Sequence, residues 1–569
     1  MAEKMYKILI NDTLGRYIAA SKQIKAGELI LVEEPVLVGP QLDGPSICFN
    51  CCRNVRISGY IFCRNCNKAI ICGPKCTGNL HTTEECLSLK EASVTGEILA
   101  RYGQIVFPLR CILWKKYKTN VFESFMQLES HLERRRDTHI WRRHKIAVED
   151  ILRYQLFENV NNELVQKVCG ILDVNSFEIR PPTSSVEMIK NPGVQCLRGL
   201  YLQAALMAHD CVGNTHLSVD DDFLLRIHAS VDIPEGTPIF FNYCNVLQGT
   251  IDRKQHLREG KYFECCCVRC KDATELGTDL SSLKCHRCRK GLIRLINPET
   301  AKSNWECVEC SKKFASGLIN LTVQEGRRRI HDLGRENTIL TLLKANNWIR
   351  CFADYSNINE MEKLLATLSV TFHPNHFLIL ELQQNMAGAY TRLPPNKKNL
   401  SRKIALCQWL LNVFCKIEPG LSRMKALTLY ELQSSLIDLS NKQHRDKEIT
   451  DEKLVTKLLS AESILKESIQ HLLYEPLKSP EGKIAQRAMY ELKMLRTSIS
   501  SIQEDVLKSS KQRTKLGRRI GRELTDNDEN KIDCKTEEDK ELIKDKLENG
   551  NSKSSRRRRH KKKNIQNNN

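Results

Sequence analysis

The 569-residue chain lacks the features that direct a protein into or across a membrane. It contains no run of about 18 apolar residues, so no transmembrane helix and no membrane partner are expected. The first residues, MAEKMYKILINDTLG, do not show the basic-then-apolar order of a secretory signal. We therefore expect a cytoplasmic and nuclear protein. Because the chain is too long for a single core, we expect two to four domains.

The chain is nevertheless rich in cysteine, with 25 of these residues. Because the cytosol and the nucleus are reducing, the thiols are expected to bind metal rather than to form disulfides. Four pairs of ligand residues follow one another within residues 48–86: Cys48-x2-Cys51, Cys63-x2-Cys66, Cys72-x3-Cys76 and His81-x4-Cys86. Eight ligands are the number that two tetrahedral zinc ions require. We expect this segment, which has few large apolar residues, to fold only with metal and to act as a docking or scaffold module.

Two further cysteine groups lie beyond residue 200. The first is a C-x-C-x2-C knot, one thiolate short of a tetrahedral zinc site: Cys265, Cys267 and Cys270. Cys211, far away in the sequence, could supply its fourth ligand. The second group consists of two C-x2-C pairs that are 18 residues apart: Cys285, Cys288, Cys307 and Cys310. This spacing is typical of a zinc ribbon, and four protein ligands leave no open position for catalysis.

Charge is concentrated at the end of the chain. The net charge of +20 suggests an acidic partner, and residues 508–569 hold 20 Lys or Arg against 11 Asp or Glu. From residue 506 on, high charge and few aromatic residues predict a disordered tail. Its basic block RRRRHKKK at 556–563 suits nuclear import or contact with nucleic acid, and a solubilising end is the alternative. The arginine runs at 134–136 and 142–143 are interpreted as a solvated helix face rather than a nucleic-acid patch.

Two long regions show apolar residues at helical spacing, residues 87–185 and 325–505. Asn175 to Ile179 is expected to be a strand, and Pro181-Pro182 to begin a loop. In the second region, paired apolar segments bounded by prolines loosely resemble tetratricopeptide-like hairpins, and a plain helical bundle is the alternative.

The stretch from Gly199 to Cys270 connects these regions. It contains a His209-Asp210-Cys211 turn, an apolar run that ends at Tyr243, and the cysteine knot. Preceded by the paired zinc ligands, this order of motifs resembles the SET-and-MYND family, and in detail its arthropod SmydA-type members. The resemblance covers roughly the first 500 residues and implies an α+β fold built on a SET-domain β-fold. The implied segments are the N-terminal part of the SET domain at 1–47, a MYND zinc finger at 48–86, a helical SET insert at 87–185, the SET core at 186–246, a post-SET zinc knot at 247–275, a zinc-ribbon insertion at 276–324, a helical TPR-like domain at 325–505 and the basic tail at 506–569.

The resemblance also implies roles for individual residues. It makes the chain a protein-lysine methyltransferase that uses S-adenosylmethionine, with Tyr243 as the catalytic residue. The residues that match the donor-binding positions are Gly15, Arg16, Tyr17, Ala208, His209, Tyr243 and Phe263. In the cross-braced MYND finger, Cys48, Cys51, Cys72 and Cys76 share one zinc ion, and Cys63, Cys66, His81 and Cys86 share the other. A third zinc ion belongs to Cys211 with the post-SET knot, and a fourth to the ribbon.

Two positions depart from the family pattern at the donor site. Tyr17 stands where many active SET proteins have the second glycine of a Gly-x-Gly turn, which lets the backbone approach the donor. Ala208 stands where the family usually has an asparagine whose side chain holds the amino-acid end of the donor. Losing such a hydrogen bond typically costs about 1 kcal/mol. SmydA-type members commonly share both departures.

Methyl transfer to an amine sets requirements that these residues can meet. The amine must be neutral, aligned with the S–CH3 bond and shielded from water, and alignment alone contributes several kcal/mol. Tyr243 could orient the methyl group and help an ammonium to lose its proton. The apolar surroundings of Phe240-Phe241 and Phe263 would lower the pKa of the amine.

Two hypotheses from different classes follow. The first is a methyltransferase that acts on a lysine of a histone or non-histone protein, with a role in transcription. The second is a catalytically weak or inactive adaptor, which recruits protein partners through the MYND finger and the helical domain. A nucleic-acid binder acting through the basic tail is a third and weaker idea.

Overall fold

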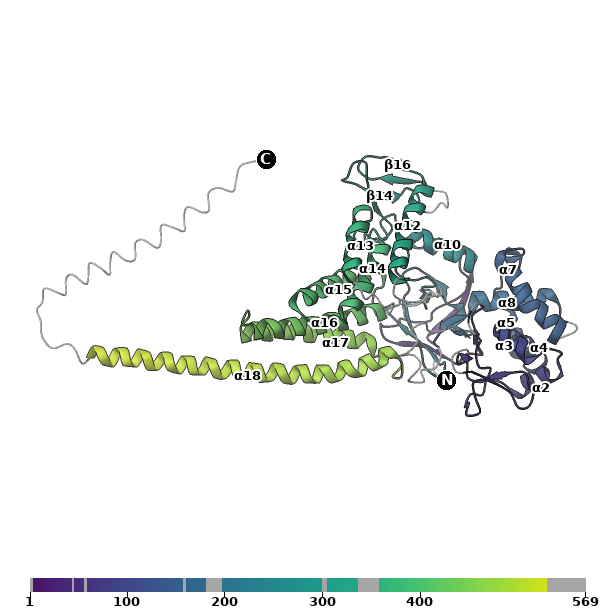
Figure 1. Cartoon of the computed structure of the whole chain (residues 1–569), viewed down its shortest axis with the longest axis horizontal. Coiled ribbons are helices and arrows are strands. Elements are labelled where there is room, and N and C mark those ends of the chain that lie inside the picture. The colour runs from purple at the N-terminus through teal and green to yellow at the C-terminus, as the bar shows by residue number, and fades with distance from the viewer. Residues whose placement is uncertain are drawn as a thin grey trace, which may run out of the picture. The chain divides into compact units, whose positions relative to one another are not determined.

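The computed structural model describes residues 4–42, 44, 46–55, 59–156, 160–180, 197–298, 304–335 and 358–529 of the chain. It divides into two compact units, residues 1–499 and 500–569. Figure 1 traces the first unit from the N-terminal strands through a helical segment and back into a region of small sheets, followed by a run of helices. Among the described residues, no helix combines the length and apolar character that crossing a membrane requires.

Small sheets, built from strands far apart in the sequence, form the centre of the first unit. β1 (Tyr6–Asn11) and β2 (Gly15–Ala20) form a hairpin, whose turn closes with Gly15 in the left-handed region at φ +67°. The other strands are β3 (Leu29–Glu33), β4 (Leu37–Pro40), β7 (Phe177–Ile179), β8 (Leu197–Leu200), β9 (Ala208–His209), β10 (Thr215–Val219), β11 (Leu225–Ala229) and β12 (Phe240–Phe241). They pair in the orders β10-β11-β3, β4-β8-β7 and β12-β9, and only the last pair is parallel. β7 confirms the strand expected at the end of residues 175–179.

Residues 48–175 contribute the finger-like segment and a helical region. The finger contains the two-residue strands β5 (Ile61–Phe62) and β6 (Ile70–Ile71). The helices are α2 (Thr83–Glu91), α3 (Gly96–Arg101), α4 (Val106–Tyr117), α5 (Thr119–Met126), α6 (Leu132–Arg135), α7 (His139–His144) and α8 (Asn162–Asn175), with the short turns η1 (Gly103–Ile105), η2 (Lys145–Glu149) and η3 (Leu152–Leu156). This confirms the helical character expected from residue 87, whereas the Pro181-Pro182 loop lies outside the described residues.

A continuous apolar core joins this helical region to the sheets. Nine successive residues of α4, Val106 to Trp114, are buried. Phe107 packs directly on Gly39 of β4, where a Cβ atom would lie only 2.3 Å from the phenyl ring. Glycine at position 39 therefore lets the helix approach the sheet closely.

A compact segment follows the sheets. η4 (Ala204–Leu206) precedes β9, and α10 (Thr250–Gly260) and α11 (Val268–Lys271) surround the cysteine knot. A four-stranded antiparallel sheet comes next, in the order β13 (Leu283–Lys284), β14 (Leu292–Leu295), β15 (Trp305–Cys307) and β16 (Lys313–Phe314). The two C-x2-C pairs lie in this region of the chain, and its assignment to a zinc ribbon stays a prediction.

Helices make up the rest of the described chain. They are α12 (Ser316–Arg335), α13 (Ile358–Thr371), α14 (Phe377–Tyr390), α15 (Lys397–Ile417), α16 (Arg423–Arg445), α17 (Asp451–Leu472) and α18 (Pro480–Glu529). From α13 to α17 each helix packs against the next, as Figure 1 shows. Asn396, Ser422 and Thr450 cap the N-termini of α15, α16 and α17 with their side chains. The assignment to a TPR-like domain stays a prediction.

The end of the chain differs from the expectation of a tail that is disordered from residue 506. α18 continues to Glu529, so residues 506–529 are helical. Lys, Arg, Glu and Leu dominate this segment, and their good helix propensity offsets the low aromatic content that suggested disorder. The basic block at 556–563 lies outside the described residues.

The helices contact the region of small sheets through a close backbone approach. The amide of Leu421 donates to the carbonyl of Ser230 at 2.9 Å, and a Cβ at Gly420 would lie 1.8 Å from that oxygen. Beside it, Arg423 pairs with Glu475 through two hydrogen bonds of 2.7 and 2.8 Å and also donates to the carbonyl of Leu217. This junction therefore combines a glycine contact with a buried ion pair.

Candidate functional site

The structure gathers cysteine and histidine side chains into four groups, and within each group the ligand atoms lie within 4.8 Å of one another. The groups are Cys48, Cys51, Cys72 and Cys76; Cys63, Cys66, His81 and Cys86; Cys211, Cys265, Cys267 and Cys270; and Cys285, Cys288, Cys307 and Cys310. We call the third the knot cluster and the fourth the ribbon cluster. These are the same four groups that the sequence analysis assembled, and each could hold a zinc ion.

The sulfur spacings have the size that tetrahedral zinc demands. A Zn–S bond of about 2.3 Å gives tetrahedral S···S edges of about 3.8 Å. The structure has sulfur–sulfur distances of 3.6 Å between Cys51 and Cys72, and 3.8 Å between Cys48 and Cys76. The chemistry of the donor set and its spacing therefore both fit zinc.

His81 is oriented by a buried chain of charged groups that the sequence analysis missed. Its Nε2 lies 3.8 Å from the Cys66 sulfur, and its Nδ1 lies 2.8 Å from the Glu85 carboxylate. Glu85 in turn accepts a 2.6 Å hydrogen bond from Nε of Arg110. A carboxylate on the second ring nitrogen is the usual way to fix the tautomer of a metal-binding histidine. The i,i+4 spacing of His81 and Glu85 was the signal available in the sequence.

The knot cluster is buried and receives hydrogen bonds from an arginine. Cys211 lies 3.4 Å from Cys270, measured between sulfurs, although 59 residues separate them. Arg253, whose side chain is 0% exposed, donates from Nε to the Cys211 sulfur at 3.3 Å and from Nη2 to the Cys270 sulfur at 3.5 Å. Its Nη1 pairs with Glu275 at 2.6 Å. The guanidinium charge therefore lies where four thiolates around one Zn²⁺ would leave an excess of negative charge.

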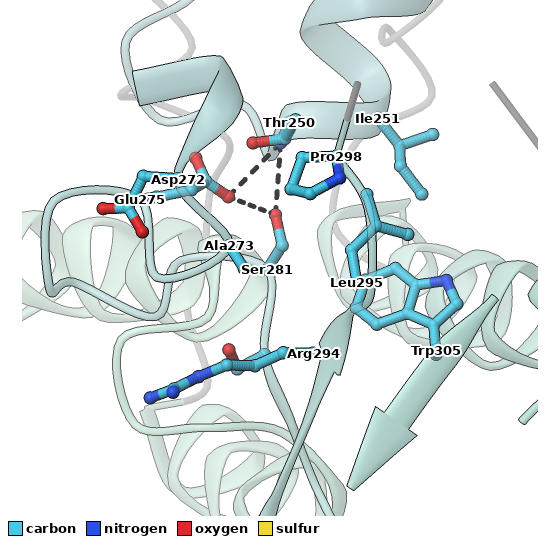
Figure 2. Close-up of a pocket in the computed structure, with 11 residues that line it drawn as sticks. Thr250, Ile251, Asp272, Ala273, Glu275, Ser281, Arg294, Leu295, Pro298 and Trp305 are labelled. Atoms are coloured by element: carbon cyan, nitrogen blue, oxygen red, sulfur yellow. Dashed lines mark hydrogen bonds between the residues drawn. The ribbon is translucent and has the colours of Figure 1, made fainter. Parts of the chain in front are cut away.

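Glu275 extends this network toward the ribbon. Its second carboxylate oxygen accepts hydrogen bonds from the Ser281 hydroxyl and from the amide of Thr250 at the start of α10, as Figure 2 shows. These residues line a small pocket together with Arg294 and Trp305 of the ribbon sheet. The pocket contains none of the residues predicted for methyl transfer, so it lies apart from that site.

The strands β9 and β12 bring the predicted catalytic residue to the His209 turn. Their parallel pairing sets Phe240 beside Ala208 and Phe241 beside His209. Asn214 ties the pair together, because its Oδ1 accepts from the Phe240 amide at 2.7 Å.

Tyr243 makes two polar contacts at this point. Its backbone amide donates to Nδ1 of His209 at 3.0 Å, and its phenol donates to the carbonyl of Met207. Burial lowers the pKa of His209 to about 4, which keeps its imidazole neutral and able to accept this bond. Burial also raises the pKa of Tyr243, so its phenol keeps the proton. The His209 ring lies 5.0 Å from the Tyr243 ring and 5.7 Å from the Phe263 ring, measured between centroids.

The knot cluster supports this arrangement directly. Tyr243 and Phe263 pack against its cysteines, and Cys211 follows His209 by two residues. Nε2 of His209 lies 3.3 Å from the Cys211 sulfur. A metal held by the knot cluster would thus fix the turn and the phenol relative to each other.

The two residues that depart from the family pattern belong to one small apolar cluster. Tyr17 and Ala208, each only 8% exposed, form it with Ala19 of β2. Gly15 and Arg16 precede Tyr17 at the exposed hairpin turn, where Arg16 donates to the carbonyl of Gln127 at 3.1 Å. The predicted donor residues therefore separate into the cluster of Tyr17 and Ala208 and a group formed by His209, Tyr243 and Phe263.

Comparison with known proteins gives the chain its relatives. It is 27% identical over 330 residues to the SET domain-containing protein SmydA-8, isoform A, of Drosophila melanogaster, which covers 54% of this chain and 65% of that protein. Isoform B matches at 25% over 322 residues, with 55% and 68% covered. The chain is a SmydA-type SET-domain relative. It also matches the Histone-lysine N-methyltransferase ASHR2 of Arabidopsis thaliana, at 24% identity over 283 residues, with 45% of this chain and 69% of that protein covered.

The match spans about two thirds of the length of these relatives, and no family model matches the chain. At the level of the family, these SET-domain relatives, one of them named a histone-lysine N-methyltransferase, indicate lysine methyltransferase-like proteins.

In this SET-domain chain, the residues that sequence reasoning missed are charged and buried. Arg253 lies four residues before the fully buried Leu257, on the inner side of α10, and Arg269 follows inside the knot itself. A charge at a position that helical periodicity assigns to the core was the only signal for Arg253. The sequence alone did not indicate that its partners are two cysteine sulfurs and Glu275.

Proposed function

We propose that the chain is an S-adenosylmethionine-dependent protein-lysine methyltransferase with Tyr243 as its catalytic residue. The observation that supports it most is the meeting of two oxygens, the Tyr243 phenol and the Met207 carbonyl, beside the His209 turn. The bound donor would supply an electrophilic methyl group on a sulfonium. Paired oxygens suit such a methyl group, because its polarised hydrogens make weak C–H···O contacts. The proposed substrate is a lysine side chain of a histone or non-histone protein, with a consequence for transcription.

The residues around Tyr243 fit the donor at its methyl and aromatic end. The His209 ring lies within 6 Å of both the Tyr243 ring and the Phe263 ring, an aromatic surrounding that suits a flat base. Gly15, Arg16, Tyr17 and Ala208 are proposed to complete the donor site at its amino-acid end. Because the Tyr243 phenol keeps its proton, its role is to orient by donating a hydrogen bond, not to act as a phenolate base.

Four zinc ions are part of this proposal: two in the MYND-type finger, one in the knot cluster and one in the ribbon cluster. The knot ion would hold the His209 turn against Tyr243, and the finger would serve as a docking module for peptide partners. Measuring the zinc content of the purified full chain tests this count, and fewer than four ions per chain would contradict it.

Donor binding followed by methyl transfer is the decisive experiment. Calorimetry with S-adenosylhomocysteine should show saturable binding, and lysine peptides should accept a methyl group from S-adenosylmethionine. Tyr243→Phe should keep donor binding and lower transfer at least about 100-fold, within the range of positioned hydrogen-bonding groups. Tyr201→Phe is the matched control, because the Tyr201 phenol also donates to a carbonyl, that of Phe223 at 2.6 Å, but in the core. No binding at millimolar ligand, or full transfer by Tyr243→Phe, would overturn the proposal.

One observation favours the second candidate, a catalytically inactive scaffold that recruits proteins through its finger and helices. The buried Tyr17 belongs to the same apolar cluster as Ala208, at the amino-acid end of the proposed donor site. In this case wild-type chain would not bind S-adenosylhomocysteine, and the double variant Tyr17→Gly with Ala208→Asn would gain binding. A wild-type chain that binds the donor tightly would exclude this candidate.

A further inference from the structure

The amine of Lys261 lies against the face of the proposed catalytic tyrosine. Its Nζ is 5.5 Å from the centroid of the Tyr243 ring, a distance at which cation and ring attract each other. The same amine donates to the carbonyls of Asp173 at 3.3 Å and Val174 at 2.5 Å, in the last turn of α8. The C-terminal end of a helix favours a cation. Lys261 therefore joins the helical region before β7 to the ring of Tyr243.

The backbone that carries Lys261 is held in place by the same helical region. Arg134 donates to the carbonyl of Tyr262, and the His131 ring lies 5.3 Å from the Tyr262 ring. Tyr262 adopts φ +62°, which is uncommon for a residue other than glycine and persists where the surroundings enforce it. The position of the Lys261 amine is thus built into the fold and does not belong to a side chain that extends into solvent.

Lys261 also lacks an ion-pair partner among the residues that the structure describes, whereas the buried Lys403 pairs with the carboxylate of Glu431. Burial outweighs the attraction of the ring and of the helix end, and it lowers the pKa of Lys261 to about 8. An environment of this kind suits an amine that has to lose its proton before it reacts.

We propose that Lys261 fills the amine subsite of the site built around Tyr243. Its side chain lies where the lysine of a substrate would otherwise meet the phenol ring, so an external lysine enters only after Lys261 has left. Lys261 is therefore a specificity-determining residue, which selects against small or weakly held amines. The proposal depends on the proposed function only in naming this place as the acceptor end of a methyl-transfer site.

The first test measures the subsite without any methyl donor. Lys261→Ala in the full, zinc-loaded chain should open a space that n-butylamine fills. Calorimetry should show saturable one-to-one binding to Lys261→Ala, at least tenfold tighter than to wild type. Lys254→Ala is the matched control, because Lys254 is also buried and donates to a carbonyl, that of Pro298, away from Tyr243. Equal binding by wild type, or equal gain in Lys254→Ala, would overturn the proposal. If Lys261→Ala does not fold, Lys261→Val serves in the same titration.

The second test uses methyl transfer to a lysine peptide. Lys261→Ala empties the subsite and should raise kcat/KM for the peptide at least tenfold, while Lys261→Arg, which keeps a long side chain there, should not. If S-adenosylhomocysteine binds and Lys261→Ala leaves kcat/KM unchanged or abolishes transfer, the inference fails and the proposed function stands. If the donor does not bind at all, the proposed function fails, and the n-butylamine titration alone decides whether Lys261 fills an amine subsite.

Discussion

The knot cluster and the ribbon cluster each consist of four cysteines, but they depend on the fold in different ways. The knot brings Cys211 to Cys265 across 54 residues, and Arg253 donates to two of its sulfurs. The ribbon closes within 25 residues, and its Cys288 sulfur accepts from the backbone amide of Gly291 at 3.4 Å. The sulfurs of the local cluster thus accept hydrogen bonds from its own backbone, whereas the sulfurs of the long-range cluster accept them from the side chain of Arg253.

The difference has a consequence for function. Tyr243 and Phe263 pack on the knot cluster, so any change in the knot is transmitted to the proposed catalytic site. The ribbon cluster contacts β13 to β16 and, through a bridge between Leu283 and Phe372, the helices that follow. We therefore expect damage to the knot to abolish function and damage to the ribbon to remain local.

The largest effect is expected from breaking each cluster in turn. Cys270→Ser should lower the free energy of unfolding by at least about 5 kcal/mol, because structural zinc contributes about 10 kcal/mol or more. Cys310→Ser should release one zinc ion, and the increase in amide hydrogen exchange should be confined to residues 283–314. Zinc content, thermal unfolding and amide hydrogen exchange would measure both. If Cys310→Ser also exposed the amides near Tyr243, the contrast between the clusters would be wrong.

Removing the arginine without touching a cysteine sharpens the comparison. Arg253→Met removes the nearer of the two buried arginines that pair with Glu275 and the donor to two sulfurs, and we expect a loss of about 3–5 kcal/mol, as for other broken buried pairs. Arg294→Met is the control, since Arg294 makes a similar two-bond pair with Asp279 but remains 27% exposed. The control should cost about 1 kcal/mol or less. Equal losses in urea unfolding would show that Arg253 acts as an ordinary ion pair.

A second Arg–Glu pair, that of Arg423 and Glu475, lies outside the cysteine clusters. It therefore tests how much charge alone contributes to stability. Burial alone would raise the pKa of Glu475, but the charge of Arg423 and the nearby His216, whose Nε2 lies 3.1 Å from the carboxylate, bring it down to about 2. The stabilisation that ionised Glu475 gives the folded state is therefore fully present above pH 4.5, the ordinary pKa of a glutamate carboxyl. It is lost as the pH falls toward 2. The loss should be about 2–3 kcal/mol. Unfolding in urea at pH 7, 5 and 3 with excess zinc measures it, and Glu475→Gln should flatten the profile.

Particular residues show what the sequence could predict. Cysteine and histidine spacing identified the ligands of all four groups, because few residue types bind zinc and their number per ion is fixed, and the family resemblance divided the first eight into the two groups that the structure has. Even the distant Cys211 was found, since the knot lacked one ligand. Tyr243 was singled out through the family resemblance, and β9 and β12 do bring it to His209.

Contacts between side chains from distant segments could not be predicted from the sequence. Arg253 and Lys261 are ordinary charged residues in α10 and the loop after it, and only the tertiary fold shows that one reaches sulfur and the other an aromatic face. The helical course of residues 506–529 was also missed, because charge and low aromatic content describe solvent exposure rather than backbone conformation.

The smallest effect we predict is a coupling between Tyr17 and Ala208. Position 208 lies in the same buried apolar cluster as Tyr17, so the larger and polar side chain of Ala208→Asn should be destabilising. In the Tyr17→Gly background the same change should cost about 1–2 kcal/mol less, which a double-mutant cycle in urea unfolding would measure. Additive costs would mean that the two side chains do not restrict each other. A coupled pair would explain why the two departures from the family pattern occur together: a large ring at 17 requires a small residue at 208, and each would constrain the amino-acid end of the donor site through the other.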